Sequence, residues 1–352
     1  MDYSIALASE LDSWRWVKRA EELGFSSAWF YDTQLLNPDV FICMALAAEK
    51  TSRIRLGTGV LVPSNRIEPV TANALASLNK LAPGRIDFGV GTGFTARRTM
   101  GLKAIPLNSM RTYIERVQAL VRGELIDWDF EGKQRKIKFL NPELDLINVH
   151  DEVPLWISAF GPKSQQLTAQ LGAGWLNFMA MPGAVSALQD MQQSWQDAGN
   201  AAEDLSAGLF FLGAVLTGDA ESDNEKLLAQ GGPFTAVGMH NLSDDGGAMG
   251  GQTAQGPMAE LHQAYMREHA KYEPADAKYL QNHRGHLMFV RPEEAHLYSP
   301  EVVRASTMSG THDELVANMR TLAVAGYQQV VVQLVHGHEE AIEDWAAVFK
   351  AM

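Results

Sequence analysis

The sequence predicts an α/β fold, a (β/α)8 TIM barrel with insertions after its fourth and seventh strands. Eight short runs of nearly continuous apolar residues recur along the chain, and amphipathic segments of helical period separate them. Such runs are typical of parallel strands covered by helices, and eight is the number of strands that closes a barrel. An open doubly wound sheet fits less well, because its nucleotide loop follows strand 1, where Ser9-Glu10-Leu11 contains no glycine.

The elements follow one another in alternation. The first strand precedes a helix in which Trp14, Val17, Ala20 and Leu23 recur every three residues before Gly24 ends it. The predicted strands cover residues 3–8, 27–31, 55–62, 86–90, 154–159, 175–179, 207–216 and 328–335. The predicted helices, after the one that Gly24 ends, include residues 39–51, 69–81, 109–122, 163–171, 183–198 and 338–350.

Two gaps interrupt this spacing, from 93 to 154 and from 216 to 328, and we interpret them as insertions. We predict a single barrel domain over residues 1–352, with an insertion or lid region at 218–300. Residues 241–258, NLSDDGGAMGGQTAQGPM, are too rich in glycine to hold a fixed core. They indicate a mobile lid over the barrel mouth, although a tolerated surface insertion explains them almost equally well.

Composition limits the possible partners. The chain has 352 residues, of which 46% are hydrophobic and 20% charged, as in ordinary globular proteins. Its net charge of −13 argues against nucleic acid and anionic membranes as partners. No apolar stretch approaches membrane-spanning length and the N-terminus has no basic leader, so we expect a cytoplasmic protein. The single cysteine, Cys43, lies in an apolar run typical of a core.

Two strand-to-helix turns have the features of anion sites. After the fourth strand, Gly91, Thr92 and Gly93 allow backbone N–H groups to approach an anion, and Arg97 and Arg98 can supply charge. After the fifth strand, a turn of small residues opens a helix whose first N–H groups are free. This second turn consists of Ser158, Ala159, Phe160, Gly161, Pro162, Lys163 and Ser164, the last of which can equally be a simple helix cap.

Acid–base candidates are less clear. Glu10 at the end of the first strand is also typical of a rim ion pair with Lys or Arg. His336 and His338 are two residues apart, but no acidic third ligand follows at metal spacing, so we predict no metal site. His286 in the large insertion can either reach a substrate or cap a helix. No Ser/His/Asp arrangement is recognisable, which favours chemistry carried out by a cofactor.

The chain resembles the luciferase-like flavin-dependent oxidoreductases, which include bacterial luciferase, alkanesulfonate monooxygenase and the coenzyme F420-dependent reductases. The resemblance spans most of the chain through motifs that keep their order and spacing. These are ALASELDSWRWVKRAEELGFSSAWFYD, RIRLGTGVLVPSNRIEPVTANALASLNKLAPGRIDFGVGTG, VPLWISAFGPKSQQLTAQLGAGWL and SGTHDELVANMRTLAVAGYQQVVVQLV. The resemblance implies a (β/α)8 barrel enzyme, a homodimer and a flavin-type cofactor.

The resemblance divides between FMN and F420. The turns GVGTG and SAFGP and the position of Glu10 resemble the F420 branch. However, Thr33 or Gln34 stands where F420 dehydrogenases carry a histidine, and Phe94 where they carry a glutamate. Arg98 resembles the arginine that holds the FMN phosphate in luciferase-type members, and Ser164 falls near their phosphate serine.

We therefore expect reduced FMN and an O2-dependent monooxygenase acting on a small organic substrate, with a flavin reductase as a possible partner. The alternatives are an F420-dependent reductase or dehydrogenase and a non-catalytic flavin-binding barrel. The expected catalytic residues are Glu10, Gln34 and His286. The expected cofactor-binding residues are Gly59, Gly91, Thr92, Gly93, Arg98, Ser158, Ala159, Phe160, Gly161, Pro162 and Ser164.

Overall fold

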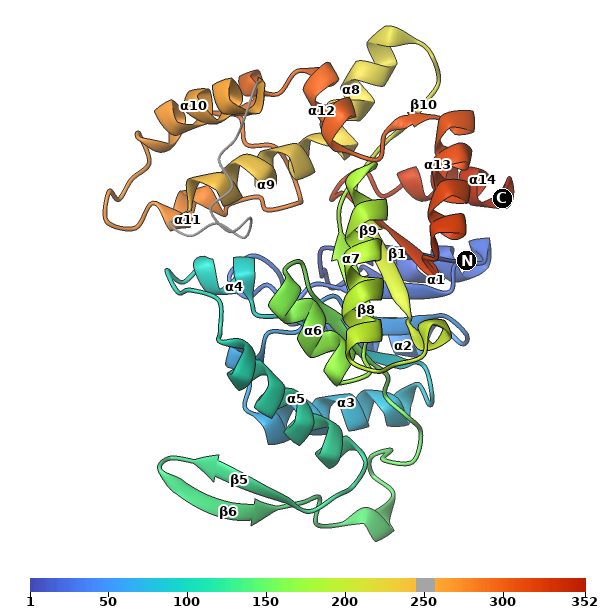
Figure 1. The fold of residues 1–352 in the computed structure, drawn as a ribbon, viewed down its shortest axis with the longest axis vertical. Helices are drawn as coiled ribbons and strands as arrows, with labels where there is room; N and C mark the ends of the chain where they lie inside the picture. Colours follow the sequence, from blue (N-terminus) through green and yellow to red (C-terminus); the bar gives the residue numbers. More distant parts are fainter. Residues whose placement is uncertain (245–256) are drawn as a thin grey trace.

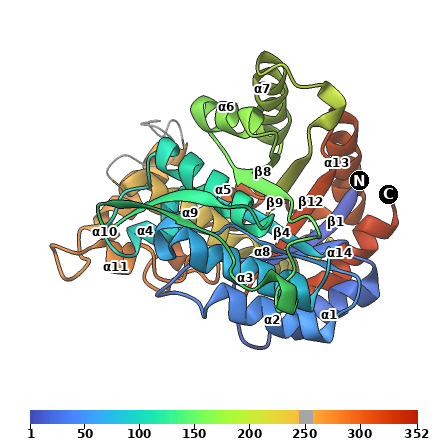
Figure 2. The same ribbon diagram turned by 90° about the horizontal axis from the view of Figure 1, so that it is seen from below.

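The computed structural model describes residues 1–244 and 257–352 and contains a closed parallel barrel (Figures 1 and 2). The strand order around the barrel is β1-β12-β9-β8-β7-β4-β3-β2, and β1 also pairs with β2, which closes the ring. The strands are β1 (Asp2–Leu7), β2 (Ser27–Phe30), β3 (Arg55–Thr58), β4 (Ile86–Val90), β7 (Leu155–Ser158), β8 (Gly174–Phe178), β9 (Ala207–Phe211) and β12 (Gln329–Leu334). The predicted fold class is confirmed.

A ring of helices covers the barrel, and an apolar core fills the space between them. These helices are α1 (Trp14–Leu23), α2 (Val40–Lys50), α3 (Glu68–Leu81), α5 (Leu107–Val121), α6 (Pro162–Gln170), α7 (Gly183–Asp197), α13 (His312–Ala325) and α14 (Ala341–Lys350). Gly24 ends α1 as predicted, because its φ of 92° is in the left-handed region that favours glycine. The last helix begins at Ala341 rather than at 338, since His338 closes a turn by donating its N–H to the carbonyl of Val335.

Two strands end several residues before their predicted bounds. β3 ends at Thr58, the Gly59–Val60 peptide bond is cis, and Leu61 rejoins the barrel as an isolated bridge to Val90. A Cβ at Gly59 would lie 2.9 Å from Cβ of Trp29, so packing inside the barrel requires glycine there. The predicted strand 207–216 divides into β9 and the short β10 (Val215–Leu216), which pairs with β11 (Gly310–Thr311) outside the barrel.

The first insertion is smaller than its gap suggested, because α5 within that gap is itself a barrel helix. The added elements are α4 (Phe94–Arg98), the hairpin β5 (Ile126–Phe130) and β6 (Lys133–Ile137), and a short 3-10 helix, η2 (Pro142–Leu144). Three further 3-10 turns, η1 (Pro63–Asn65), η3 (Ala202–Asp204) and η4 (Ala295–Leu297), lie in other loops. The hairpin projects from the end of the molecule opposite the second insertion (Figure 1).

The second insertion is a helical cap that contains α8 (Ala220–Gln230), α9 (Gly232–Ser243), α10 (Pro257–His269), α11 (Tyr279–Asn282) and α12 (Pro300–Ser306). It extends beyond the predicted boundary at 300, because α12 packs on α8 and α9. Of the glycine-rich segment 241–258, residues 245–256 lie outside the described part of the chain. Its ends are helical, since 241–243 finish α9 and 257–258 begin α10.

A fully buried polar network holds the cap together. The guanidinium of Arg291 donates to both carboxylate oxygens of Glu294, at 2.8 and 2.7 Å, and both side chains are completely buried. His240 lies 2.9 Å from the same carboxylate, while the hydroxyl groups of Tyr265 and Tyr272 accept from Arg291. Because such groups are costly to bury unpaired, these mutual contacts fix how the cap helices pack.

Within the described residues, no helix combines the length and apolar character needed to cross a membrane.

Candidate functional site

The cap reaches into the mouth of the barrel at a turn that contains Leu287. Leu287 packs in an apolar cluster with Leu212, Val237 and Val335, against which Tyr31 and Phe178 also lie. Its carbonyl accepts a 2.9 Å hydrogen bond from the amide of Gln333 on β12. The hydroxyl of Tyr31, which follows β2, donates to Oε1 of the same Gln333 side chain at 2.5 Å. The barrel mouth is therefore bounded by strand ends below and by residues of the cap above.

The glycine turn after β4 is tightly packed. Gly93 has a φ of 76°, and a Cβ there would lie 2.4 Å from Cγ1 of Val62. A Cβ at Gly91 would lie 2.8 Å from Cγ2 of Val60 and 3.6 Å from Cβ of Ser158. The carbonyl of Thr92 accepts from the N–H of Ile105. Since Ser158 ends β7, the two predicted anion turns lie side by side, as the pairing of β4 with β7 requires.

Arg98 contacts the cap in this structure. Its Nη1 lies 2.7 Å from Oδ2 of Asp244, and its guanidinium stacks over the ring of Phe94 at 3.6 Å from the ring centre. Burial lowers the pKa of Arg98, although Asp244 opposes that shift. The pair joins α4 beside the glycine turn to the end of α9. The Nε of Arg97 donates to the carbonyl of Lys103 in a contact that is exposed to solvent.

The start of α6 is open. Ser164 Oγ donates to the carbonyl of Gly161 at 2.8 Å and accepts from the N–H of Gly161 at 3.2 Å, so Ser164 is a capping residue here. No atom lies within 4 Å of the position that a Cβ at Gly161 would occupy. Phe160 is half exposed, whereas Ala159 is buried and accepts from the indole of Trp175. Pro162 occupies the first helical position, where its missing N–H costs nothing.

His286 and Gln34 both contact α4. His286 Nε2 lies 3.2 Å from Oγ1 of Thr95, while its Nδ1 is buried and has no hydrogen-bond partner among the described residues. Burial lowers the pKa of His286 well below its ordinary value, so the ring is neutral at pH 7. Gln34 Nε2 donates to the carbonyl of Ala96, and its Oε1 accepts from Asn65. Sequence spacing gave no indication that His286 and Gln34 approach the same helix.

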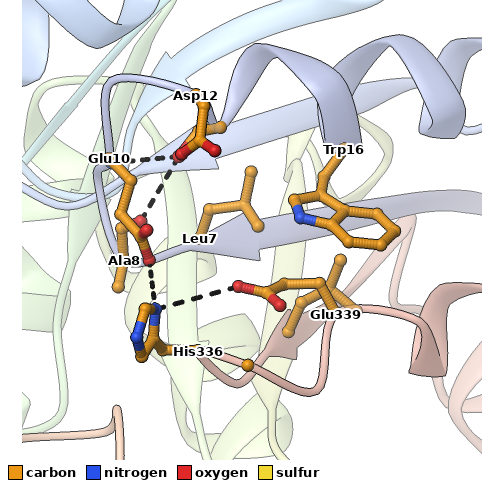
Figure 3. A pocket seen from close by; sticks show the side chains of 10 residues that line it. Leu7, Ala8, Glu10, Asp12, Trp16, His336 and Glu339 are labelled. Carbon is orange, nitrogen blue, oxygen red and sulfur yellow. Dashed lines mark hydrogen bonds and ion pairs between the residues drawn. The ribbon is translucent and has the colours of Figure 1, made fainter.

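Glu10, the third predicted catalytic residue, lies elsewhere. Its carboxylate contacts Nδ1 of His336 at 2.6 Å, and Glu339 lies 4.0 Å from the same nitrogen (Figure 3). These side chains line a pocket of about 210 Å3 together with Leu7, Leu334 and Trp16 of α1. Leu7 and Leu334 belong to the core between strands and helices, so this pocket is on the outer side of the barrel.

Two predictions about this region are wrong. The partner of Glu10 is a histidine rather than Lys or Arg. Acidic groups also do lie close to His336, since its ligand atoms and those of Glu10 and Glu339 are all within 4.8 Å of one another. Glu339 is only three residues away in sequence, but Glu10 is brought close by the pairing of β1 with β12.

Sequence reasoning also underestimated Asp32. This buried carboxylate accepts from the N–H of Val62 at 3.0 Å and from Nη1 of Arg66 at 3.0 Å, and Arg66 also pairs with Asp39. Asp32 therefore fixes the loop after β3 that packs on the glycine turn. Gln333 and Tyr31 were missed as well, because nothing in a strand-end sequence shows that a distant cap turn will bond to it.

Comparison with known proteins identifies the family. The sequence model described as luciferase-like monooxygenase matches residues 12–329. The chain belongs to this family. The 5,10-methylenetetrahydromethanopterin reductase of Archaeoglobus fulgidus is 27% identical over 330 residues, which cover 90% of this chain and 87% of that protein. The F420-dependent glucose-6-phosphate dehydrogenase of Kineococcus radiotolerans is 31% identical over 175 residues, which cover 45% of this chain and 49% of that protein.

The fold is also that of solved structures. The coenzyme F420-dependent tetrahydromethanopterin reductase from Methanopyrus kandleri superposes with a TM-score of 0.70 at 18% identity, covering 98% of this chain and 97% of that one. The predicted family resemblance and the prediction of a luciferase-like oxidoreductase enzyme are confirmed. The roles of the individual cofactor-binding and catalytic residues stay predictions.

In this luciferase-like oxidoreductase, the two chain segments that contain the predicted anion turns include no carboxylate side chain. We call the part of the barrel mouth that they form the cationic sector. Neither residues 91–114 nor residues 153–189 include Asp or Glu, although the chain has a net charge of −13. The same two segments contain Arg97, Arg98, Lys103, Arg111 and Lys163. They lie together because β4 pairs with β7. This sector is therefore the part of the barrel mouth best suited to an anionic ligand.

Proposed function

We propose that the protein is a coenzyme F420-dependent oxidoreductase that transfers a hydride between F420 and a small organic substrate. The observation that carries this proposal is the cationic sector at the ends of β4 and β7, whose own two segments contain no Asp or Glu, because it suits the phosphate that F420 carries. Support also comes from a relative, 31% identical over 175 residues, whose name states F420 dependence. The comparisons thus favour the alternative predicted from sequence over the FMN-dependent monooxygenase.

The residues at the barrel mouth fit such a cofactor. The start of α6 is open at Gly161, where no atom lies within 4 Å of the position of a Cβ, whereas the glycine turn beside it is packed by Val60 and Val62 and offers its backbone alone. The buried Nδ1 of His286 has no partner within the described part of the chain, which is the condition expected of a group that meets a ligand. Bound F420 would supply the hydride chemistry, which no side chain of this protein can supply.

The protein's own part would be to bind, orient and exclude water. The start of α6 and the glycine turn would hold the phosphate, and the apolar cluster around Leu287, Tyr31 and Phe178 would keep water from the mouth. A hydride transfer to or from a carbonyl also requires a proton at the oxygen. The neutral ring of His286 can carry that proton at Nδ1, while Thr95 holds Nε2.

The test is a fluorescence titration of the purified protein with F420 and with FMN, side by side. We expect binding of F420 and at least about a hundredfold weaker binding of FMN. Tight FMN binding with negligible F420 binding would overturn the proposal and restore the FMN-dependent monooxygenase. That enzyme would need a separate flavin reductase to supply reduced FMN. Binding of either cofactor without turnover of any substrate in a broad panel would support the non-catalytic barrel.

A further inference from the structure

A groove of about 500 Å3 runs along the outside of the barrel between α5 and α6. From α5 it is lined by Leu107, Asn108 and Arg111, and from α6 by Lys163, Gln166 and Gln170. Lys163 is the second residue of α6, so the groove begins at the same helix start where we place the cofactor phosphate. Gln166 and Gln170 continue along one side of α6 at helical spacing.

The lining of this groove is cationic and amide-rich. Arg111 and Lys163 supply positive charge from two different helices, and three amide side chains supply hydrogen-bond donors and acceptors. None of the described residues that line it has a carboxylate. Arg111 lies 3.8 Å from the carboxylate of Glu115 on the next turn of α5, and it also donates to the side chain of Gln170. The groove therefore extends the cationic sector outward from the barrel mouth.

We propose that this groove binds a carboxylate-bearing tail that continues beyond the phosphate of the cofactor. In F420 that tail is an oligoglutamate chain attached through lactate to the phosphate, whereas FMN ends at its phosphate. Carboxylates along such a tail match Arg111 and Lys163, and its amide bonds match Asn108, Gln166 and Gln170. This inference rests on the proposed function, since it assigns the outer part of the same cofactor.

The experiment compares F420 carrying several glutamates with a tailless form that ends at the phospholactyl group. Dissociation constants are measured by fluorescence for the wild type and for the variant Arg111→Gln, which leaves the start of α6 intact. We expect the wild type to bind the long-tailed form about three- to tenfold more tightly at low salt, as for a few exposed charge pairs. The Arg111→Gln variant should lose most of this preference and bind the tailless form as the wild type does. Added salt should reduce the preference.

The control is Arg122→Gln, which removes an exposed cation from the far end of α5, where Arg122 pairs with Glu124. It should bind both forms like the wild type. Equal affinity of the wild type for both forms would overturn the groove inference while leaving the proposed function intact. An equal loss of both forms in the Arg111→Gln variant would overturn it too, because this cation would then act on the phosphate. If neither form binds, the proposed function is wrong and this inference fails with it.

Discussion

At the scale of single residues, His286 is the side chain on which the proposed reaction depends most. We expect His286→Gln to lower kcat by about 10² to 10⁴-fold, the usual contribution of a positioned acid or base. The dissociation constant for F420 should change by less than about threefold. Stopped-flow turnover and fluorescence titration measure the two quantities. His312→Gln, at an exposed position on α13, is the matched control and should leave both unchanged.

The pH dependence of the reaction gives a second test of His286. Burial lowers the folded-state pKa of this ring well below 6.5, so it remains neutral as the pH falls through 6.5. We expect kcat to stay constant from about pH 8 to about pH 6 and to decline only at lower pH. A decline centred near pH 6.5 would show that an ordinary exposed histidine, and not His286, controls the reaction.

Arg98 has a partner in the cap that competes with its predicted role. Its ion pair with Asp244 is 2.7 Å long, and both side chains are mostly buried. If Arg98 also serves the phosphate, Arg98→Gln should weaken F420 binding by about 1.5 to 3 kcal/mol, the worth of a charge-assisted hydrogen bond. Asp244→Asn should strengthen binding, because it removes the competing carboxylate. A deazaflavin without phosphate is the control ligand. The prediction fails if its binding changes as much as that of F420.

How much of the site could be foreseen differs from residue to residue. The glycine turn and the start of α6 were predictable, because backbone chemistry at a strand end depends on local sequence. The partner of Arg98 was not, since Asp244 is 146 residues away and reaches it only through the packing of the cap. The same holds for Glu10, whose contact with His336 depends on closure of the barrel.

At the scale of elements, the cap depends on one buried polar network. Burial alone would raise the pKa of Glu294, but hydrogen bonds from Arg291 and His240 lower this pKa to about 2. A carboxyl whose folded pKa lies below its unfolded value of about 4.5 contributes stability above that pH. This contribution is lost as the pH falls from about 4.5 to about 2. Hydrogen exchange of α9 and α10 should therefore accelerate over this range before that of the barrel strands.

A substitution tests the same network at neutral pH. Arg291→Met leaves the carboxylate of Glu294 buried without its main partner and should cost about 3 to 5 kcal/mol in the free energy of unfolding of the cap. Arg284→Met is the matched control, since Arg284 forms an exposed pair with Glu293 and should cost less than about 1 kcal/mol. Urea denaturation measures both. Equal losses in the two variants would contradict a special role for the buried network.

Among the elements, regular helices were the easiest to predict. Their apolar period and end signals are local, as the agreement at α1 and Gly24 shows. The helix α13 was not separately predicted, although Thr311 and Glu314 form a capping box at its start. The course of the cap helices was not predictable, because buried pairs such as Arg291 with Glu294 replace the apolar stripe that usually reveals a helix face.

At the scale of the whole molecule, the outer face of α2 and α3 is the expected contact of the homodimer that the family resemblance implies. Residues 40–48 and 69–79 contain no charged side chain, although the chain has a net charge of −13. Ile42, Leu46 and Val70 on these two packed helices are 55%, 37% and 50% exposed. A second copy that meets this face with its own brings two uncharged surfaces together, whereas other orientations oppose like charges.

We therefore expect a dimer in analytical ultracentrifugation and a monomer for the variant Ile42→Glu/Val70→Glu. In a symmetric contact, the two new carboxylates of one copy would be buried against the same two of the other copy. Residues 40–48 and 69–79 contain no cation to pair with them, so association should weaken at least about a hundredfold. Val324→Glu, on α13 at a position that is 90% exposed, is the control and should remain dimeric. Circular dichroism establishes that each variant is folded. A dimer that persists in the Ile42→Glu/Val70→Glu variant would place the contact on another face, and a monomeric wild type would contradict the homodimer itself.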